Sequence, residues 1–394
     1  MSRFKILNAM MMITGTSVGT GILGLPIVTS SSGFILTLVA FLVAWVFMTL
    51  AAYYILEVKM RVRGSYNLSS MIKLTLGKPG QYFSSMIILL LLYALLCTYM
   101  MAGAAWLNLL IAPVVSVPIS LTTLIFTVLF AVIILCGERF IYNINNLFGV
   151  GLLVAFIITV GSSLSPTQHA FITNCHLIDT LSSLPLLLTT FGFSIVVPAV
   201  TEYLDYNEKS VKISIMSGSL VALAAYAIWE WVALGNIPLD GPVSFQTLKQ
   251  TGDNGTGVIV ALAASAGSSW VFFSGRLFAI FAVVTSFLGV SLALNHFFSD
   301  AIKMESTGKK RFMLALMTYI PPMIITYAYP KAFVQILSFA GIFVALLLGL
   351  FPALMVFKTR NFLPTGRQGG LMMGCVSLFF ILVIVQEIIN LIGS

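Results

Sequence analysis

Two stretches of the chain place glycine, hydroxyl residues and proline inside long apolar segments. The first is GTSVGTGILGLP at residues 15–26, and the second is TTFGFSIVVP at residues 189–198. Glycine weakens a helix and proline breaks one. An interrupted helix offers N–H groups that attract a carboxylate and C=O groups that attract an ammonium group or a cation. Both stretches therefore have the chemistry to bind a zwitterion such as an amino acid.

Neither stretch contains a charged residue. A buried Asp or Arg would be expensive at mid-membrane depth, whereas the ends of interrupted helices supply partial charges, and glycine lets a ligand come close to the backbone. A second interpretation of the first stretch stays open. Gly15 and Gly19 have the GxxxG spacing that serves helix packing in membranes.

The composition of the chain is that of an integral membrane protein. Of its 394 residues, 59% are hydrophobic and 8% are charged, whereas a soluble domain has about 25% charged residues. No charged residue lies between Lys5 and Glu57 or between Lys78 and Glu138, and each run can hold two spans of about 20 residues. The runs are continuously apolar, so they predict helices and not the alternating strands of a membrane β-barrel.

We expect eleven transmembrane helices in a single membrane domain that occupies residues 1–394. A short external helix is also expected within residues 258–269. The eleven spans lie near residues 6–30, 34–56, 82–110, 119–136, 147–165, 181–205, 212–235, 275–300, 312–329, 332–357 and 370–391.

The basic residues predict the orientation of these spans. All but three of the 20 Lys and Arg residues fall in loops on one side of the membrane, and the exceptions are Lys249, Arg276 and Lys331. The positive-inside rule then places the N-terminus in the cytoplasm and the C-terminus outside. The net charge of +8 thus reflects topology, and we expect no nucleic-acid partner.

The two interrupted stretches occupy matching positions in two halves of the chain. They lie in the first and sixth spans, and each is followed by a proline, Pro26 or Pro198. Because each half has five spans, the halves would run through the membrane in opposite directions. Interrupted segments at matching positions indicate the binding site of a transporter built from inverted repeats. The repeats would cover residues 6–165 and 181–357, with an extra helix at 370–391.

On these motifs and eleven spans, the chain resembles the bacterial aromatic amino acid permeases. These include tyrosine-specific and tryptophan-specific permeases, within the hydroxy/aromatic amino acid permease group of the amino acid–polyamine–organocation superfamily. The resemblance implies a leucine-transporter-type fold of five plus five helices with an eleventh helix added. It also implies import of an aromatic amino acid, tyrosine or tryptophan, by proton-coupled symport and alternating access. The membrane would be the bacterial inner membrane, which places the C-terminus in the periplasm.

The resemblance also implies the residues of the substrate site. One departure concerns the tyrosine-permease pattern, which has a histidine after Phe-Gly-Phe where this chain has Ser194, so the choice of aromatic substrate stays open. Serine, threonine, branched-chain amino acids or a polyamine are alternative substrates. The implied site residues are Thr16, Ser17, Gly19, Thr20 and Gly21 from the first span and Thr190, Phe191, Gly192, Phe193 and Ser194 from the sixth.

Two kinds of coupling ion are considered. In the eighth span, Ala282, Thr285 and Ser286 match the A-x-x-T-S pattern with which sodium-coupled members of the fold hold Na⁺. Their hydroxyl groups are equally suited to bonding their own helix. Proton coupling is the first expectation, and it needs an ionisable carrier. The candidates are Glu202, which we rank first, and Asp205, Glu230, His296, Asp300 and Glu387.

Other functions receive little support from the sequence. No HExxH motif occurs in the chain, and the GxSxG spacing occurs only as GTSVG at residues 15–19, inside a long apolar segment and not after a strand. We therefore expect no enzyme. The four cysteines and three histidines are too scattered to predict a metal site or a cofactor. A receptor that senses an amino acid without moving it remains an alternative, although no signalling domain is expected. Phe191, Phe193, Tyr93, Tyr99 and Phe287 are candidates for the apolar wall around an aromatic substrate.

Overall fold

The computed structural model describes residues 3–19, 21–64, 66–112, 114–135, 138–164, 177–252, 255–302, 308–360 and 367–393. All regular elements within these ranges are helices. Eight of them are long and apolar enough to cross a membrane, or nine when one bent pair is counted as a span. The expected all-α membrane protein is confirmed at this level. The predicted count of eleven spans is higher than eight or nine.

The first predicted span consists of two helices. Helix α1 (Arg3–Ser17) and helix α2 (Gly21–Thr29) are bent by 53° relative to each other. Thr20, which lies in the break, is outside the described residues. The sequence explains the break, because Gly19 and Gly21 flank it and glycine carries no side chain to favour a continuous helix.

The sixth predicted span is also interrupted. Helix α7 (Leu177–Thr190) ends before Phe191, a 3-10 segment follows at Gly192–Val196, and helix α8 (Val197–Tyr203) completes the span. Pro198 lies in the first turn of α8, where its missing N–H removes no helical hydrogen bond. This span changes its helical geometry at the motif, whereas the first span bends sharply.

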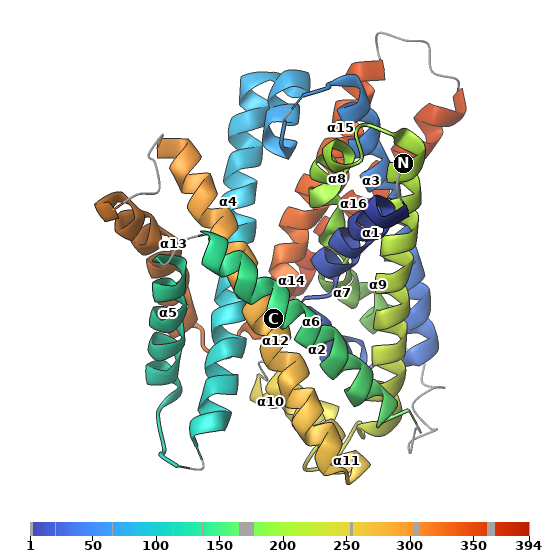
Figure 1. Ribbon diagram of the computed structural model, residues 1–394. Coiled ribbons are helices and arrows are strands. Elements are labelled where there is room, and N and C mark those ends of the chain that lie inside the picture. The colour runs from blue at the N-terminus through green and yellow to red at the C-terminus, as the bar shows by residue number, and fades with distance from the viewer. Residues whose placement is uncertain are drawn as a thin grey trace.

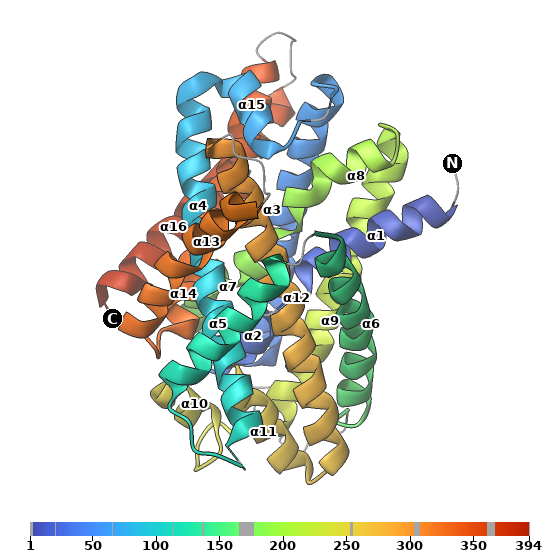
Figure 2. The same ribbon diagram turned by 60° about the vertical axis from the view of Figure 1, so that its left-hand side comes forward.

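Figures 1 and 2 show the bundle formed by the helices. The N-terminus, α8 and the α3–α4 connection lie at one end, here called the N-terminal end, and α10 and α11 lie at the opposite end, here called the α11 end. Between the two interrupted spans lie α3 (Phe34–Arg61), α4 (Leu68–Ile111), α5 (Ile119–Leu135) and α6 (Glu138–Gly161). After them follow α9 (Glu208–Asn236), α10 (Phe245–Thr251), α11 (Thr256–Ala266), α12 (Ser269–Ile302), α13 (Gly308–Ala328), α14 (Phe333–Val344), α15 (Phe351–Arg360) and α16 (Arg367–Gly393).

Local sequence signals fix several helix boundaries. Asn67 and Asn207 precede α4 and α9, and each side chain accepts a hydrogen bond from the backbone N–H three residues later, as N-cap residues do. Within α4, Gly77 has a φ of 81°, so the helix is kinked there. A residue with a Cβ rarely adopts this conformation. The external short helix predicted at 258–269 corresponds to α11.

Two helices explain most of the difference in span count. Helix α5 is apolar but has only 17 residues, which is at the short end of the range of about 17–25 residues for a helix that crosses a bilayer. Helix α13 begins with a basic run at Lys309, Lys310 and Arg311 and contains Pro321 and Pro322, which makes it less apolar than its neighbours. Both coincide with predicted spans, at 119–136 and 312–329.

Candidate functional site

The two interruptions lie against each other in the middle of the bundle. A Cβ added to Gly21 would be 2.7 Å from Cγ2 of Thr190, so glycine is the residue that permits this approach. The hydroxyl oxygen of Tyr226, on α9, lies 2.6 Å from the carbonyl oxygen of Ser17 and 2.9 Å from that of Thr190. One buried side chain thus joins the last residue of α1 to the last residue of α7.

Tyr226 leaves acceptor capacity at this junction. A tyrosine hydroxyl has one hydrogen, so it donates to one of the two carbonyl oxygens at a time. The carbonyl oxygen of Ser17 also accepts from the backbone N–H of Gly19 at 2.9 Å. Because each carbonyl can accept two hydrogen bonds, the carbonyl to which Tyr226 does not donate still has capacity for another donor. An ammonium group is a suitable donor for such a pair of oxygens, because both stand at the C-terminal end of a helix.

The predicted site residues of the first span differ in burial and in the elements they contact. Ser17 is buried, and its hydroxyl donates to Ile13 within α1. Thr16 is exposed, and its hydroxyl donates to Met12, also within α1, at 2.7 Å. A Cβ on Gly19 would be 2.8 Å from Oγ of Ser286 on α12. The break therefore contacts α12 through Gly19, whereas the side chain of Thr16 lies on an exposed face of α1.

The packing interpretation of the GxxxG spacing is not supported at Gly15. A Cβ there would meet no atom within 4 Å, whereas one on Gly19 would be tightly confined. The two glycines thus do not form a shared helix-packing surface. Gly19 is instead required where the break meets α12.

The predicted residues of the sixth span are almost all buried. Phe191 and Phe193 are fully buried, and so is Ser194. Thr190 donates its hydroxyl to Leu187 within α7. The hydroxyl of Ser194 has no hydrogen-bond partner among the described residues, which is uncommon for a buried polar group and leaves it available to a ligand.

Aromatic rings surround the junction. Phe191 packs edge-on against Tyr226, with ring centroids 5.1 Å apart, and Phe41 of α3 lies 6.1 Å from Tyr226 and 6.4 Å from Phe191. The hydroxyl of Tyr99, on α4, hydrogen bonds to Ser286. Sequence reasoning did not select Tyr226 or Phe41. A tyrosine in the middle of an apolar span is a usable signal, because its buried hydroxyl needs a partner.

The other aromatic candidates have contacts elsewhere. Tyr93 donates its hydroxyl to the carbonyl of Met317 on α13 at 2.8 Å. Phe287 stacks on Tyr319, with centroids 5.7 Å apart, and also contacts Phe126. These contacts stabilise the packing of α4, α5, α12 and α13 and are not contacts with either break.

The sodium candidates lie on α12 beside Gly19. Ala282 is buried, and the hydroxyl of Thr285 lies 2.8 Å from the carbonyl oxygen of Phe281 and 3.2 Å from that of Ala282. Hydrogen bonding of this kind to the preceding turn is common for threonine in a helix. This bonding uses the hydroxyl hydrogen of Thr285 but leaves lone pairs on its oxygen. The arrangement is therefore compatible both with sodium binding and with a purely structural hydrogen bond within α12.

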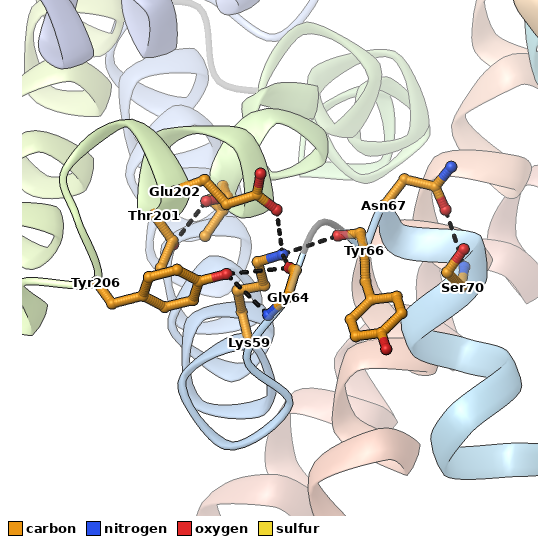
Figure 3. Close-up of polar contacts among 9 residues, drawn as sticks. Lys59, Gly64, Tyr66, Asn67, Ser70, Thr201, Glu202 and Tyr206 are labelled. Carbon is orange, nitrogen blue, oxygen red and sulfur yellow. Dashed lines mark hydrogen bonds and ion pairs between the residues drawn. The ribbon is translucent and has the colours of Figure 1, made fainter.

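Glu202, the acid ranked first from the sequence, forms an ion pair at the N-terminal end of the bundle. Its Oε1 lies 2.5 Å from Nζ of Lys59, whose side chain is fully buried. Figure 3 shows that Lys59, at the end of α3, also donates to the carbonyl oxygens of Gly64 and Tyr66. The hydroxyl of Tyr206 contacts the backbone of Gly64 as well. This cluster, here called the Lys59 cluster, connects α3, the α3–α4 connection and α8.

The Lys59 cluster allows a stability prediction. Glu202→Gln removes the counter-charge of a buried ammonium, and hydrogen bonds to charged groups contribute about 1.5–3 kcal/mol. Glu208→Gln is the matched control, because Glu208 pairs with Lys212 where both side chains are more than half exposed, and such helix pairs contribute about 0.3–0.5 kcal/mol. We expect a clearly larger drop in the thermal unfolding temperature of detergent-solubilised protein for Glu202→Gln. Equal drops would contradict the role of the cluster.

The remaining ionisable candidates have diverse surroundings. Asp205 pairs with Lys5 of α1 at 2.9 Å, and both side chains are substantially exposed. His296 and Asp300 lie on exposed positions of α12. Two of the candidate acids are buried. Glu387 on α16 accepts a hydrogen bond from the side chain of Asn390, and Glu230 on α9 is fully buried.

No group of three or more metal-ligating side chains occurs among the described residues. Cys97 is buried and Cys375 is exposed, and both are free thiols. Cys136, Cys175, His169 and His176 lie outside the described residues, so the structure does not test their predicted lack of a metal role.

Comparisons with known proteins agree with this arrangement. A tyrosine-specific transport system 1 from Haemophilus influenzae is 29% identical over 360 residues, which cover 91% of this chain and 89% of that protein. A tryptophan-specific transport protein from the same organism is 28% identical over 402 residues, which cover 98% and 96% of the two chains.

Among solved structures, the chain is similar to Mhp1, a nucleobase-cation-symport-1 family transporter in a closed conformation with bromovinylhydantoin bound. The TM-score is 0.65 at 13% identity, and the match covers 98% of this chain and 90% of that chain. At this identity the likeness establishes the fold.

The sequence pattern of the tryptophan/tyrosine permease family matches residues 2–392. The match confirms the resemblance to aromatic amino acid permeases that the two motifs carry. Relatives named as transport proteins cover nearly the whole chain, which identifies the protein as a transporter and not an enzyme. The chain is a multi-pass membrane protein that belongs to the tryptophan/tyrosine permease family.

Proposed function

We propose that the chain is a symporter that imports an aromatic amino acid, tyrosine or tryptophan, through a site between the two helix breaks. The observation that carries this proposal is the contact of Tyr226 with the carbonyl oxygens of both Ser17 and Thr190. It brings two helix ends with free acceptor capacity to one point, in a region where the flanking motifs contain no charged side chain.

The geometry supports specific roles for the backbone. The N–H group of Gly21, at the start of α2, is suited to the carboxylate of the substrate, since a helix N-terminus attracts anions, whereas the N–H of Ile22 donates to the carbonyl oxygen of Gly19 at 3.2 Å. The carbonyl groups of Ser17 and Thr190 are suited to its ammonium group. A zwitterion would then neutralise both helix ends without a buried ion pair, which would cost desolvation free energy.

The aromatic side chain of the substrate would pack against rings at the junction. Phe191 and Tyr99 are the leading candidates, because they contact Tyr226 and Ser286 respectively. Ser194, whose hydroxyl is buried without a partner among the described residues, would bond the polar tip of tyrosine or tryptophan. A binding site of this type is mostly apolar with a few directed polar groups. The candidate set from the sequence also includes Thr16, Gly19, Thr20, Gly192 and Phe193.

The proposed architecture has eleven spans, with inverted repeats at residues 6–165 and 181–357 and the extra helix α16. Support comes from the matching interruptions in the first and sixth spans and from the likeness to Mhp1. The proposed orientation puts the N-terminal end of the bundle in the cytoplasm of a bacterial inner membrane. The basic residues of α3 and of its connection to α4 at this end support it.

The proposed driving ion is the proton, and sodium bound near Ala282, Thr285 and Ser286 is the alternative. Purified protein in proteoliposomes separates them when uptake of labelled tyrosine, tryptophan and phenylalanine is measured under imposed pH and sodium gradients in turn. We expect accumulation driven by an inside-alkaline pH gradient. Accumulation driven by sodium alone would contradict proton symport, and binding without uptake under either gradient would contradict transport.

A further inference from the structure

Helix α9 carries a second polar side chain beside Tyr226. Glu230 follows Tyr226 by four residues, so the two side chains lie on the same face of the helix, one turn apart. Tyr226 contacts the junction of the two breaks, and Glu230 lies one turn closer to the α11 end. The carboxyl of Glu230 is fully buried.

The carboxyl contacts α2, which is the second half of the broken first span. Oε2 of Glu230 lies 3.0 Å from the hydroxyl oxygen of Thr29, and that oxygen lies 2.9 Å from the carbonyl oxygen of Leu25. Oε1 of Glu230 is buried and has no hydrogen-bond partner among the described residues. Trp229, the neighbour of Glu230, is fully buried against Phe156 and Phe278.

The hydrogen count at Thr29 favours the protonated carboxyl. The hydroxyl of Thr29 has one hydrogen and two acceptors within reach. When Glu230 is protonated, it donates to Thr29, which donates in turn to Leu25, and every contact then has a hydrogen. When Glu230 is ionised, the hydroxyl can satisfy only one acceptor. The charge then lies in an apolar setting with no ion-pair partner among the residues that the structure describes, which is expensive.

Glu230 forms no ion pair among the described residues. Helices α2 and α11, which pack against this part of α9, contain no ionisable side chain. Arg276 of α12 donates to the carbonyl of Leu109, and Lys249 of α10 donates to Ser31. The other ionisable groups on elements packed against α9 belong to the N-terminal parts of α1 and α6, the C-terminal halves of α3 and α8, and the start of α9 itself. They are Arg3, Lys5, Tyr53, Tyr54, Glu57, Lys59, Arg61, Glu138, Arg139, Tyr142, Glu202, Tyr203, Glu208, Lys209 and Lys212.

We propose that Glu230 is the residue that carries the coupled proton. In the conformation described here the carboxyl holds the proton and bonds α9 to α2. Movement of α2 during the transport cycle separates Thr29 from Glu230 and admits water, and the carboxyl O–H bond breaks as its proton passes to water. The carboxylate takes a proton from the water of the opposite compartment when the contact forms again. The inference rests on the proposed proton symport.

The position of Glu230 accounts for coupling to the substrate. Helix α2 begins at the break and ends at Thr29, so one short helix connects the substrate site to the carboxyl. A ligand that shifts α2 therefore changes the proton affinity of Glu230, and the proton changes the affinity for the ligand by the same factor. Substrate affinity should depend on pH in the wild type and lose that dependence in Glu230→Gln.

The test compares two transport modes in proteoliposomes with labelled tyrosine and tryptophan. Exchange of labelled for unlabelled substrate, at equal concentrations inside and outside the vesicles, needs no net movement of protons. Accumulation of substrate under a pH gradient requires protons to move with it. The amide of Glu230→Gln can still donate to Thr29, so we expect this variant to keep exchange and to lose both accumulation and substrate-dependent acidification, read by a trapped pH dye. Glu387→Gln, which changes the other buried carboxyl, should keep all three activities.

The outcomes separate the inference from the proposed function. Accumulation and proton movement by Glu230→Gln at wild-type levels would overturn the role of Glu230 alone. A wild type that moves no protons with its substrate would overturn proton symport and this role together. If Glu230→Gln does not fold, infrared difference spectra decide. A substrate-dependent carboxyl band that shifts in Glu230→Asp supports the role, and an unshifted or absent band overturns it.

Discussion

Gly19→Val is expected to abolish most transport and Gly15→Val to leave it intact, although both changes insert the same side chain four residues apart. A Cβ at Gly19 would be 2.8 Å from Oγ of Ser286, whereas a Cβ at Gly15 would meet nothing within 4 Å. Overpacking of a tight site costs about 1–3 kcal/mol, which corresponds to roughly 5- to 150-fold. Valine adds two further methyl groups at the break, so the upper part of this range is expected.

The measurement is the initial rate of labelled tyrosine or tryptophan uptake into proteoliposomes at matched protein content. Size-exclusion profiles of both variants show whether each one inserts and folds. The pair controls for the general effect of valine in the first span, since both sites lie at the C-terminal part of α1 or directly after it. Equal uptake by the two variants would mean that the break does not form part of the substrate site.

The second large effect is expected at the contact between the two broken spans. Gly21→Ala places a Cβ 2.7 Å from Cγ2 of Thr190, so either the side chain of Thr190 must rotate or the two breaks must separate. We expect uptake to fall at least tenfold, within the range of about 1–3 kcal/mol for overpacking. Thr190→Ser removes Cγ2 but keeps the hydroxyl that donates to Leu187. The double variant should therefore transport considerably faster than Gly21→Ala.

This recovery is a test of geometry, because substitutions in contact are not additive. Thr190→Ser measured alone supplies the reference rate for the double variant. Additive losses in uptake would show that Gly21 and Thr190 do not meet in the transporting protein. The same four proteins can be compared in thermal unfolding, where the double variant should again be more stable than Gly21→Ala.

The overall arrangement could be predicted from the sequence because lipid imposes simple rules. Long uncharged runs specify helices, and each of the eleven predicted spans coincides with a helix or an interrupted helix of the structure. The glycine-rich stretch at 15–26 also marked the position of the sharp bend. Length and apolarity alone do not determine the number of spans, because α5 is short and α13 carries basic residues and two prolines.

The candidate site was predicted less completely. Motifs indicate which backbone segments are interrupted, but tertiary packing decides which side chains approach them. Tyr226 and Phe41 lie in ordinary apolar spans outside both motifs, so the motifs did not select them. Thr16, within the motif, instead bonds its own helix on an exposed face. Glu202 followed the motif closely in sequence, yet its ion pair with Lys59 lies at the end of the bundle.

Two of the ion pairs at the N-terminal end should respond differently to ionic strength. Lys5 and Asp205 connect α1 to the end of α8 with side chains that are 43% and 74% exposed, whereas Lys59 is fully buried. Dissolved salt screens exposed charges over about 8 Å at physiological concentration and much less effectively in a buried cluster. Changes in cell osmolarity would therefore loosen or tighten α1 while α3 and α8 stay joined, which makes the first half-helix the salt-sensitive part of this permease.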